Sequence, residues 1–244
     1  MKHFDDLTVV VLAGGRGTRL QGLHPDTPKP MIPIAGQPFL HWLTLWVASH
    51  GPDDFVFSTG HLAEIVEGWA TQPHLPALSR RCSRELTPLG TGGALLHALP
   101  LCRDWILVLN GDSLILRGLD ALLALRDDPE TDGGLIGVVV EDTTRYGSLV
   151  RDDEGWLAGF HEKIPGRGLI NGGVYLFRRD CLCGLGKKGA CSIEYDLFPA
   201  LIAQSARLRV VPVSGAPFID IGTPESLAQA DAFVRQHLLS PEIE

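Results

Sequence analysis

The chain has 244 residues, of which 45% are hydrophobic and 20% charged, and its formal net charge at pH 7 is −8. This length and composition predict one α/β domain with a full hydrophobic core. The acidic balance argues against broad binding to nucleic acid or to a membrane surface, because both need a basic field. An anionic substrate would need local cations or a metal ion to offset the overall charge.

No apolar run is long enough to predict a transmembrane segment, and the acidic start of the chain is unlike a signal peptide. The five cysteines are an odd number without the density of a disulfide scaffold, which predicts a reduced, cytoplasmic protein. Cys181, Cys183 and Cys191 could form a metal clip, but no fourth ligand has suitable spacing, so packing or loop roles are favoured.

Strand-like apolar runs alternate with helical patterns in the first half of the chain. The predicted elements, in chain order, are a strand at 7–12, a helix at 38–49, a strand at 55–58 and a helix at 62–70. They continue with a helix at 94–99, a strand at 105–109 and a helix at 119–126. This alternation predicts a mostly parallel sheet with helices on both faces. Trp42 and Trp46 belong to the core or to an interface, and the core is favoured.

The second half of the chain is richer in short strands. They are expected at 135–140, 148–151, 157–160 and 170–177, followed by a helix around 193–206 and strands at 208–213 and 218–221. The polar run 152–155 predicts a hairpin turn, and Thr223-Pro224-Glu225 predicts the start of a closing helix. We expect a single domain over 1–244, with a nucleotide-binding half at about 1–130 and a substrate-facing half at about 131–244.

The most informative motif follows the first strand. Residues 12–20 read Leu-Ala-Gly-Gly-Arg-Gly-Thr-Arg-Leu, and Pro28-Lys29-Pro30 comes soon after. Glycines let backbone N–H groups approach a ligand, and clustered cations suit a polyphosphate. The chain has no Gly-Lys-Ser/Thr, which excludes a Walker loop, and Leu20 occupies the third glycine position of a dinucleotide fingerprint. A glycine-rich turn with solvated arginines is the alternative, but nucleotide binding is favoured.

Two aspartates follow predicted strands. Asp112 ends Asn110-Gly111-Asp112 after the buried strand at 105–109, and Asp220 lies at the end of the strand at 218–221. Ligands of open α/β sheets bind beyond the carboxyl ends of the strands, and Mg²⁺ uses few protein carboxylates together with phosphate oxygens. Each aspartate alone could equally cap a turn or helix. Both together, given the glycine-rich loop, predict a Mg²⁺ site.

Further polar groups suit a base and a polyhydroxylated phosphate. The run 85–93 reads Glu-Leu-Thr-Pro-Leu-Gly-Thr-Gly-Gly, which predicts a tight loop able to lay its backbone against a flat base, or a simple connection to a helix. Later motifs supply hydroxyl, carboxylate, amide and amine groups, although each alone could be a solvated surface group: Arg145-Tyr146-Gly147, Glu162-Lys163 and Asn171-Gly172-Gly173.

Taken together and in this order, these motifs resemble the sugar-1-phosphate nucleotidylyltransferase family over nearly the whole chain. The runs 88–94 (PLGTGGA), 171–176 (NGGVYL) and 218–224 (FIDIGTP) most resemble D-glycero-D-manno-heptose 1-phosphate guanylyltransferases within it. The resemblance implies a Rossmann-like nucleotide-diphospho-sugar transferase fold, a mostly parallel mixed sheet flanked by helices. It also implies the conversion of an NTP, with GTP favoured, and a sugar 1-phosphate to an NDP-sugar and pyrophosphate, in the synthesis of cell-surface polysaccharide precursors.

The resemblance assigns roles to individual residues. Arg16 and Lys29 would be catalytic, and Mg²⁺ would be held by Asp112 and Asp220. Nucleotide binding is assigned to Leu12, Ala13, Gly14, Gly15, Gly17, Thr18, Arg19, Glu85, Pro88, Gly90 and Asp112. Sugar-phosphate binding is assigned to Tyr146, Gly147, Glu162, Lys163, Asn171 and Gly172. Ile164 replaces the proline that the family often has after Glu-Lys, which puts the path of the following loop in doubt.

Alternatives remain open at the level of sequence. Uridylyl or cytidylyl transfer would use the same motifs, and mannose, glucose or N-acetylmuramate phosphates would be rival acceptors. A non-catalytic sugar-nucleotide sensor would be expected to lose the loop arginine, the lysine or the carboxylates, all of which are present. A glycosyltransferase of related fold would usually have Asp-x-Asp where this chain has Asn110-Gly111-Asp112. The oligomeric state, including a homo-oligomer, is not readable.

Overall fold

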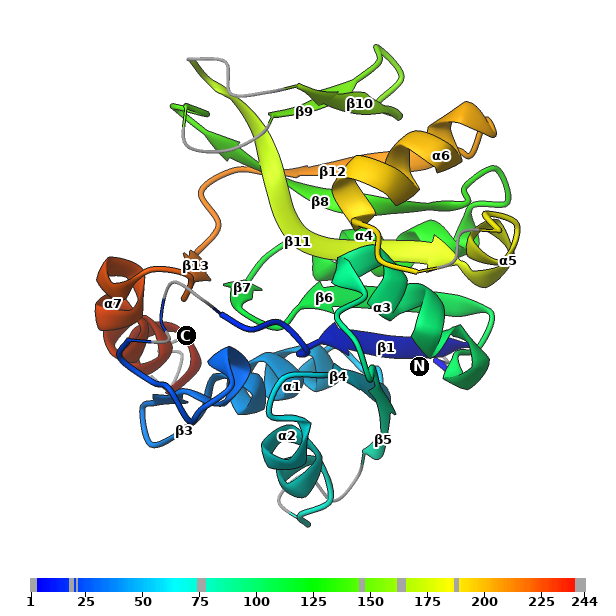
Figure 1. Ribbon diagram of the computed structural model, residues 1–244. Coiled ribbons are helices and arrows are strands. Elements are labelled where there is room, and N and C mark those ends of the chain that lie inside the picture. The colour runs from blue at the N-terminus through cyan, green and yellow to red at the C-terminus, as the bar shows by residue number, and fades with distance from the viewer. Residues whose placement is uncertain are drawn as a thin grey trace.

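A mixed β-sheet lies between two layers of helices in the computed structural model (Figure 1). The structure describes residues 4–17, 20, 22–73, 78–144, 148–161, 166–186 and 189–239. One half of the sheet is parallel. There β1 (Leu7–Leu12) lies between β6 (Trp105–Asn110) and β4 (Asp54–Thr59), and β5 (Ser79–Arg84) extends the sheet beyond β4.

The long strand β11 (Gly168–Arg178) joins this parallel part to the rest of the sheet. It runs antiparallel to β6 and to β8 (Gly133–Val140), and β12 (Leu208–Val213) pairs in parallel with β8. The antiparallel pair β9 (Ser148–Arg151) and β10 (Leu157–His161) forms the expected hairpin around the 152–155 turn. The predicted α/β fold, a mixed and largely parallel sheet flanked by helices, is confirmed.

Strand alternation creates a hydrophobic core on each face of the sheet. Val9 and Val11 of β1 pack on one side, and Val10 packs on the other. The first face is covered by α1 (Phe39–Ser49), α2 (Ala63–Ala70), α4 (Leu119–Ala124) and α7 (Pro224–Val234). The second face is covered by α3 (Gly90–Ala98), α5 (Arg179–Cys183) and α6 (Phe198–Ala203), and Figure 1 shows α3 and α6 on the near side of the sheet.

Two short ribbons and five short helices complete the described chain. The ribbons pair β2 (Pro33–Ile34) with β3 (Gln37–Pro38) and β7 (Ser113–Ile115) with β13 (Phe218–Asp220). The short helices are η1 (Lys29–Met31), η2 (Leu99–Leu101), η3 (Leu125–Asp127), η4 (Ile193–Leu197) and η5 (Arg235–Leu239). Thr223 caps α7 as predicted, since its hydroxyl accepts a hydrogen bond from Ser226 N at 3.2 Å.

Several elements differ from the prediction. The helix expected at 94–99 begins at Gly90, and the helix expected at 193–206 divides into η4 and α6. The glycines of α3 serve packing, because a Cβ at Gly90 or Gly93 would lie 2.6 Å from the carbonyl oxygen of Cys191 or Gly189. Strand β5 carries three arginines and two serines, so no apolar alternation revealed it.

Trp42 and Trp46 are 7% and 6% exposed, which places both side chains in the core, the favoured alternative. Among the described residues, no helix combines the length and apolar character needed to cross a membrane.

Candidate active site

A cavity of about 570 Å³ opens at the carboxyl ends of β1, β4, β5 and β6. Ligands of α/β sheets bind at this edge. Eleven of the predicted residues line it: Leu12, Ala13, Gly14, Gly15, Arg16, Gly17, Lys29, Glu85, Pro88, Gly90 and Asp112. They come from four separate segments of the chain, at 12–17, 29, 85–90 and 112, which the fold brings to one place.

The glycine-rich loop after β1 is held from both sides by backbone hydrogen bonds. Ala13 N donates to Ser58 O at 2.8 Å, and Gly111 N donates to Leu12 O at 3.0 Å. His61 N donates to the carbonyl oxygen of the loop's first glycine at 3.1 Å. The loop is therefore fixed between the ends of β4 and β6, and its exposed Arg16 lies on the cavity wall.

The carboxylate of Glu85 forms part of the same wall. Its Oε2 accepts a hydrogen bond from Leu89 N at 3.1 Å. A Cβ added at Gly14 or Gly60 would lie 2.7 or 2.6 Å from Oε1, so neither position has room for a side chain. Burial raises the pKa of Glu85, although the Leu89 N–H and His97 partly oppose this. The glycines thus leave an acceptor group at the cavity surface.

Lys29 and Asp112 also line the cavity, and Asp220, which is not part of the lining, lies beside them. Lys29 Nζ lies 2.5 Å from Asp112 Oδ2 and 3.7 Å from Asp220 Oδ1. The ribbon of β7 and β13 brings the two aspartates together, because Asp220 pairs with Ser113, the neighbour of Asp112. Ile221 N also donates to Asp112 O at 2.9 Å. The sequence placed each aspartate after a strand but contained no sign of this ribbon.

The donor set fits a Mg²⁺ ion that is completed by a substrate. Both carboxylates are partly open, with side chains 39% and 44% exposed. Within the described part of the chain, no group of three or more His, Cys, Asp or Glu side chains is arranged to hold a metal ion. Mg²⁺ commonly binds one or two carboxylates together with water and substrate phosphates. Two carboxylates at the edge of the cavity match that pattern.

Asn171 and Gly172 lie outside the lining of this cavity. They occupy an irregular part of β11, where the register with β8 shifts between Asn171 and Tyr175. Asn171 Nδ2 donates to Glu194 Oε1 at 2.6 Å and to Tyr175 Oη at 2.8 Å. Burial raises the pKa of Glu194, and the hydrogen bond from Asn171 lowers it in part. The structure thus shows an internal role for the Asn171 amide. The other predicted residues lie outside the described residues: Thr18, Arg19, Tyr146, Gly147, Glu162 and Lys163.

The contribution of β4 to the cavity was not predicted from the sequence. Ser58, Gly60 and His61 line the cavity at the carboxyl end of that strand. The signal was present, because the strand at 55–58 was predicted and its end lies at the ligand-binding edge of a parallel sheet. Its position beside β1 depends on pairing that the sequence pattern does not specify.

Comparison with known proteins identifies the family of this chain. The nucleotidyl transferase family model matches residues 8–237. A mannose-1-phosphate guanylyltransferase from Mycobacterium tuberculosis is 34% identical over 91% of this chain, which spans 63% of that protein's length. A D-glycero-alpha-D-manno-heptose 1-phosphate guanylyltransferase from Campylobacter jejuni is 31% identical, with coverage of 90% of this chain and 96% of the relative.

Solved structures show the same fold. The structure of HddC from Yersinia pseudotuberculosis complexed with GMP-PN superposes on this chain with a TM-score of 0.79 and is 31% identical to it. The match spans 92% of this chain and 98% of the HddC chain. A putative glucose-1-phosphate thymidylyltransferase from Bacillus anthracis has a TM-score of 0.83 at 19% identity, with 96% and 98% coverage, which supports the fold alone. The chain belongs to the nucleotidyl transferase family and, within it, to the sugar-1-phosphate nucleotidylyltransferases.

Proposed function

We propose that this chain transfers a guanylyl group from GTP to a sugar 1-phosphate and releases pyrophosphate. D-glycero-D-manno-heptose 1-phosphate is the favoured acceptor, and the product is a precursor for cell-surface polysaccharide. The observation that supports this function best is the cavity that the glycine-rich loop lines together with Lys29 and Asp112, with Asp220 3.7 Å from the Lys29 ammonium group. The heptose assignment rests on the motif resemblance and on two heptose 1-phosphate guanylyltransferases that this chain matches over nearly their whole length.

The choice of guanine is supported by the chemistry of Glu85. Guanine carries two adjacent donors on its pairing edge, N1–H and the 2-amino group. An ionised carboxylate only accepts hydrogen bonds and can receive both donors. Uracil has one N–H group flanked by two carbonyl oxygens. A carboxylate repels these oxygens, and this repulsion opposes binding of the wrong base. The related Yersinia protein HddC has been solved as a complex with GMP-PN, which agrees with this choice.

The test of base choice is a Glu85→Gln substitution. Because it removes a charge-assisted pair of hydrogen bonds, we expect kcat/KM for GTP to fall about 10- to 100-fold. The amide can donate to a carbonyl and accept from an N–H, so the ratio of UTP to GTP use rises. Pyrophosphate release is measured with four NTPs against heptose, mannose and glucose 1-phosphates. Glu141→Gln is the matched control, since that side chain is 86% exposed and lies outside the cavity.

Four results would each overturn a part of this assignment. A wild-type preference for UTP or CTP, or an unchanged preference in Glu85→Gln, would refute guanine selection by Glu85. Absence of pyrophosphate release with every pair of substrates would favour the sugar-nucleotide sensor. Transfer to mannose 1-phosphate in preference to the heptose phosphate would correct the acceptor alone, and the Mycobacterium relative makes that the second candidate.

The chemistry requires positioning more than proton transfer. A phosphate monoester is largely ionised near neutral pH, so the attacking oxygen needs no general base. We propose direct in-line attack on the α-phosphorus, with Arg16 and the N–H groups of the glycine-rich loop stabilising the pyrophosphate that leaves. Lys29 and Lys163 offset the charge of the attacking phosphate. Mg²⁺, when held by Asp112 and Asp220, would neutralise charge on the phosphate oxygens.

A further inference from the structure

The ammonium group of Lys29 occupies the space between the two carboxylates assigned to the metal. It lies 2.5 Å from Asp112 Oδ2 and 3.7 Å from Asp220 Oδ1. Its side chain is 13% exposed, whereas the two carboxylates are three times more open to solvent, at 39% and 44%. The lysine is therefore the buried member of this cluster, and the aspartates form its outer side.

The surrounding backbone holds Lys29 in this position. The residue begins η1 between Pro28 and Pro30, whose rings restrict the backbone on both sides. A Cβ at Gly17 would lie 3.2 Å from Lys29 Cβ, and a Cβ at Gly222 would lie 3.1 Å from Lys29 Nζ. The stem of the lysine thus packs beneath the phosphate loop, and its charged end reaches the aspartates. This contact is built by three separate segments of the fold.

We propose that Lys29 is an internal counter-ion that keeps free divalent cations off the Asp112–Asp220 pair until a nucleotide arrives. The inference rests on the proposed function, because it assumes that these carboxylates bind a metal. A divalent cation between them would lie within a few ångströms of the ammonium group, and like charges at that distance repel strongly in a partly buried site. The site therefore has low affinity for a metal alone.

A triphosphate relieves this repulsion in two ways. Until the sugar phosphate arrives, the oxygens of the triphosphate give the ammonium group a new partner, which draws it away from the carboxylates. They also supply ligands that the protein lacks, since within the described residues no cluster of three metal-binding side chains is present. Metal and nucleotide consequently enter together, and Lys29 moves from aspartate to phosphate as they do.

The test measures Mn²⁺ binding to the nucleotide-free protein by electron paramagnetic resonance. Mn²⁺ prefers the same oxygen ligands as Mg²⁺. We expect weak binding by the wild type and at least about 10-fold tighter binding by Lys29→Met, which keeps the length of the stem without its charge. Lys29→Arg keeps the positive charge, so its Mn²⁺ binding should remain weak. Lys29→Gln serves as a second neutral variant, and circular dichroism confirms that each variant is folded.

Two controls separate local blocking from a general change in charge. Arg16→Met removes one positive charge from the same cavity, but from a residue that the ion pairs of this cluster do not include. It should leave Mn²⁺ affinity within about 3-fold of the wild type, because exposed charges are screened. The double variant Lys29→Met, Asp112→Asn should not show the tighter Mn²⁺ binding of Lys29→Met alone, because that binding needs the Asp112 carboxylate.

Equal Mn²⁺ affinity in folded Lys29→Met and wild type would overturn the inference, as would tight binding by the wild type without nucleotide. Pyrophosphate release by the wild type is assayed separately. An active wild type with no gain in the neutral variants would refute the counter-ion role alone. An inactive wild type whose neutral variants gain Mn²⁺ affinity would refute the proposed reaction and leave the counter-ion role standing.

Discussion

Backbone hydrogen bonds hold the loop that carries Arg16 at the cavity. Arg16 is exposed and lines the cavity beside the glycines of its own loop. The loop is anchored through hydrogen bonds of Ala13 to β4 and of Leu12 to the end of β6. The backbone that carries this cation is held before the substrate binds, and such preorganisation favours the leaving-group role proposed for Arg16.

Removal of the guanidinium group should therefore slow the reaction without unfolding the protein. For Arg16→Ala we expect kcat to fall by about two to three orders of magnitude, the range for one preorganised donor of this kind. Pyrophosphate release at saturating substrates measures the change. Arg117→Ala, an exposed arginine outside the cavity, is the control. Near-normal turnover of Arg16→Ala would contradict its assignment to the leaving group.

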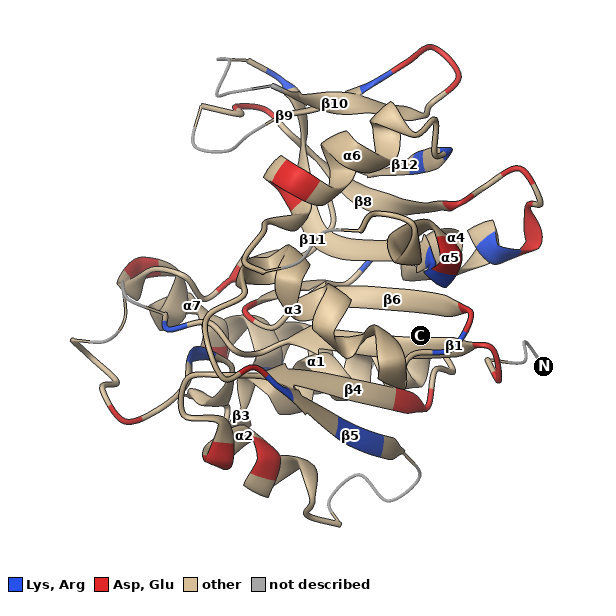
Figure 2. Cartoon of the chain, turned by 45° about the vertical axis from the view of Figure 1, so that its right-hand side comes forward, with Lys and Arg blue, Asp and Glu red and all other residues tan. Residues whose placement is uncertain are grey.

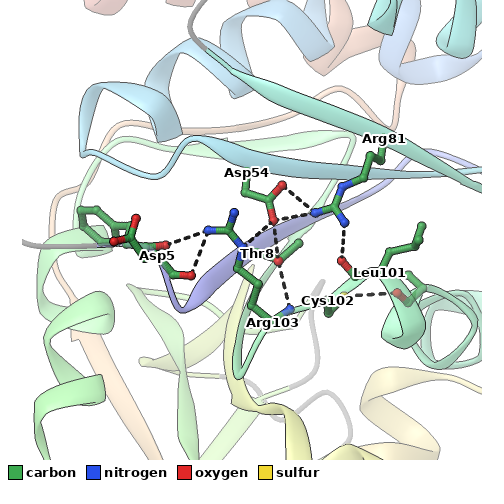
Figure 3. Close-up of polar contacts among 9 residues, drawn as sticks. Asp5, Thr8, Asp54, Arg81, Leu101, Cys102 and Arg103 are labelled. Atoms are coloured by element: carbon green, nitrogen blue, oxygen red, sulfur yellow. Dashed lines mark hydrogen bonds and ion pairs between the residues drawn. The ribbon is translucent and has the colours of Figure 1, made fainter.

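Among the elements, the amino ends of the parallel strands are tied together by a buried carboxylate. Asp54 begins β4 and is 1% exposed. Thr8 of β1 donates to Asp54 Oδ2 at 2.8 Å, and Arg81 of β5 donates to both carboxylate oxygens at 2.6 Å (Figure 3). Arg103, just before β6, lies 3.3 Å away. Figure 2 shows the acidic start of β4 beside the basic stretch of β5.

Substitution of this carboxylate should destabilise the sheet at the edge remote from the cavity. Burial by itself raises the pKa of Asp54, but hydrogen bonds from Thr8, Ser79 and Arg81 outweigh it and the pKa is lowered. A carboxylate whose pKa is lower in the folded state stabilises the fold at pH values above its unfolded-state pKa. This contribution is lost as the pH falls through the folded-state pKa. We expect Asp54→Asn to lose about 3 kcal/mol of unfolding free energy at pH 7, because a buried ion pair loses one partner.

Urea unfolding at several pH values measures this effect, and Asp53→Asn, the exposed neighbour, is the control. The difference between wild type and Asp54→Asn should shrink as pH falls below the unfolded-state pKa of aspartate. A difference that stays constant with pH would show that the ionised carboxylate is not the source of the stability. Turnover by the folded variant should match the wild type, since the substitution lies at the opposite ends of the strands.

At the scale of the whole molecule, the two predicted halves share their cores. One hydrophobic cluster joins Val9 to Ile136 and Leu176, and the other joins Val10 to Tyr175 and Phe198. Strand β11 from the second half pairs directly with β6 from the first. A boundary near residue 130 therefore does not separate two hydrophobic cores.

This continuity predicts a single cooperative unfolding transition. Four of the five tryptophans lie in residues 1–130, and Trp156 lies in the second half, so tryptophan fluorescence reports mainly on the first half. Far-ultraviolet circular dichroism reports on both halves. In urea, the two signals should change with the same midpoint. Separate midpoints would show that the halves unfold as independent units.

Much of the fold could be predicted because most of its strands contain short apolar runs. Strands β1, β9 and β12 have the predicted bounds, and β4 and β6 differ by a residue at one or both ends. Strand β5 was missed because its polar side chains show no alternation, and it forms only by pairing with β4. The start of α3 was missed because glycine opposes helix formation locally, and contact with the 189–192 segment overrides that preference.

By itself, the sequence determined the class of chemistry. Glycines, prolines and charges at short spacing specify a phosphate loop locally, and buried strands specify the sheet edge at which ligands bind. Only the tertiary structure decided that Lys29 lies between Asp112 and Asp220 and that two glycines leave space beside Glu85. These contacts join segments that are distant along the chain. Their geometry depends on strand order and on the β7–β13 ribbon, which no local pattern encodes.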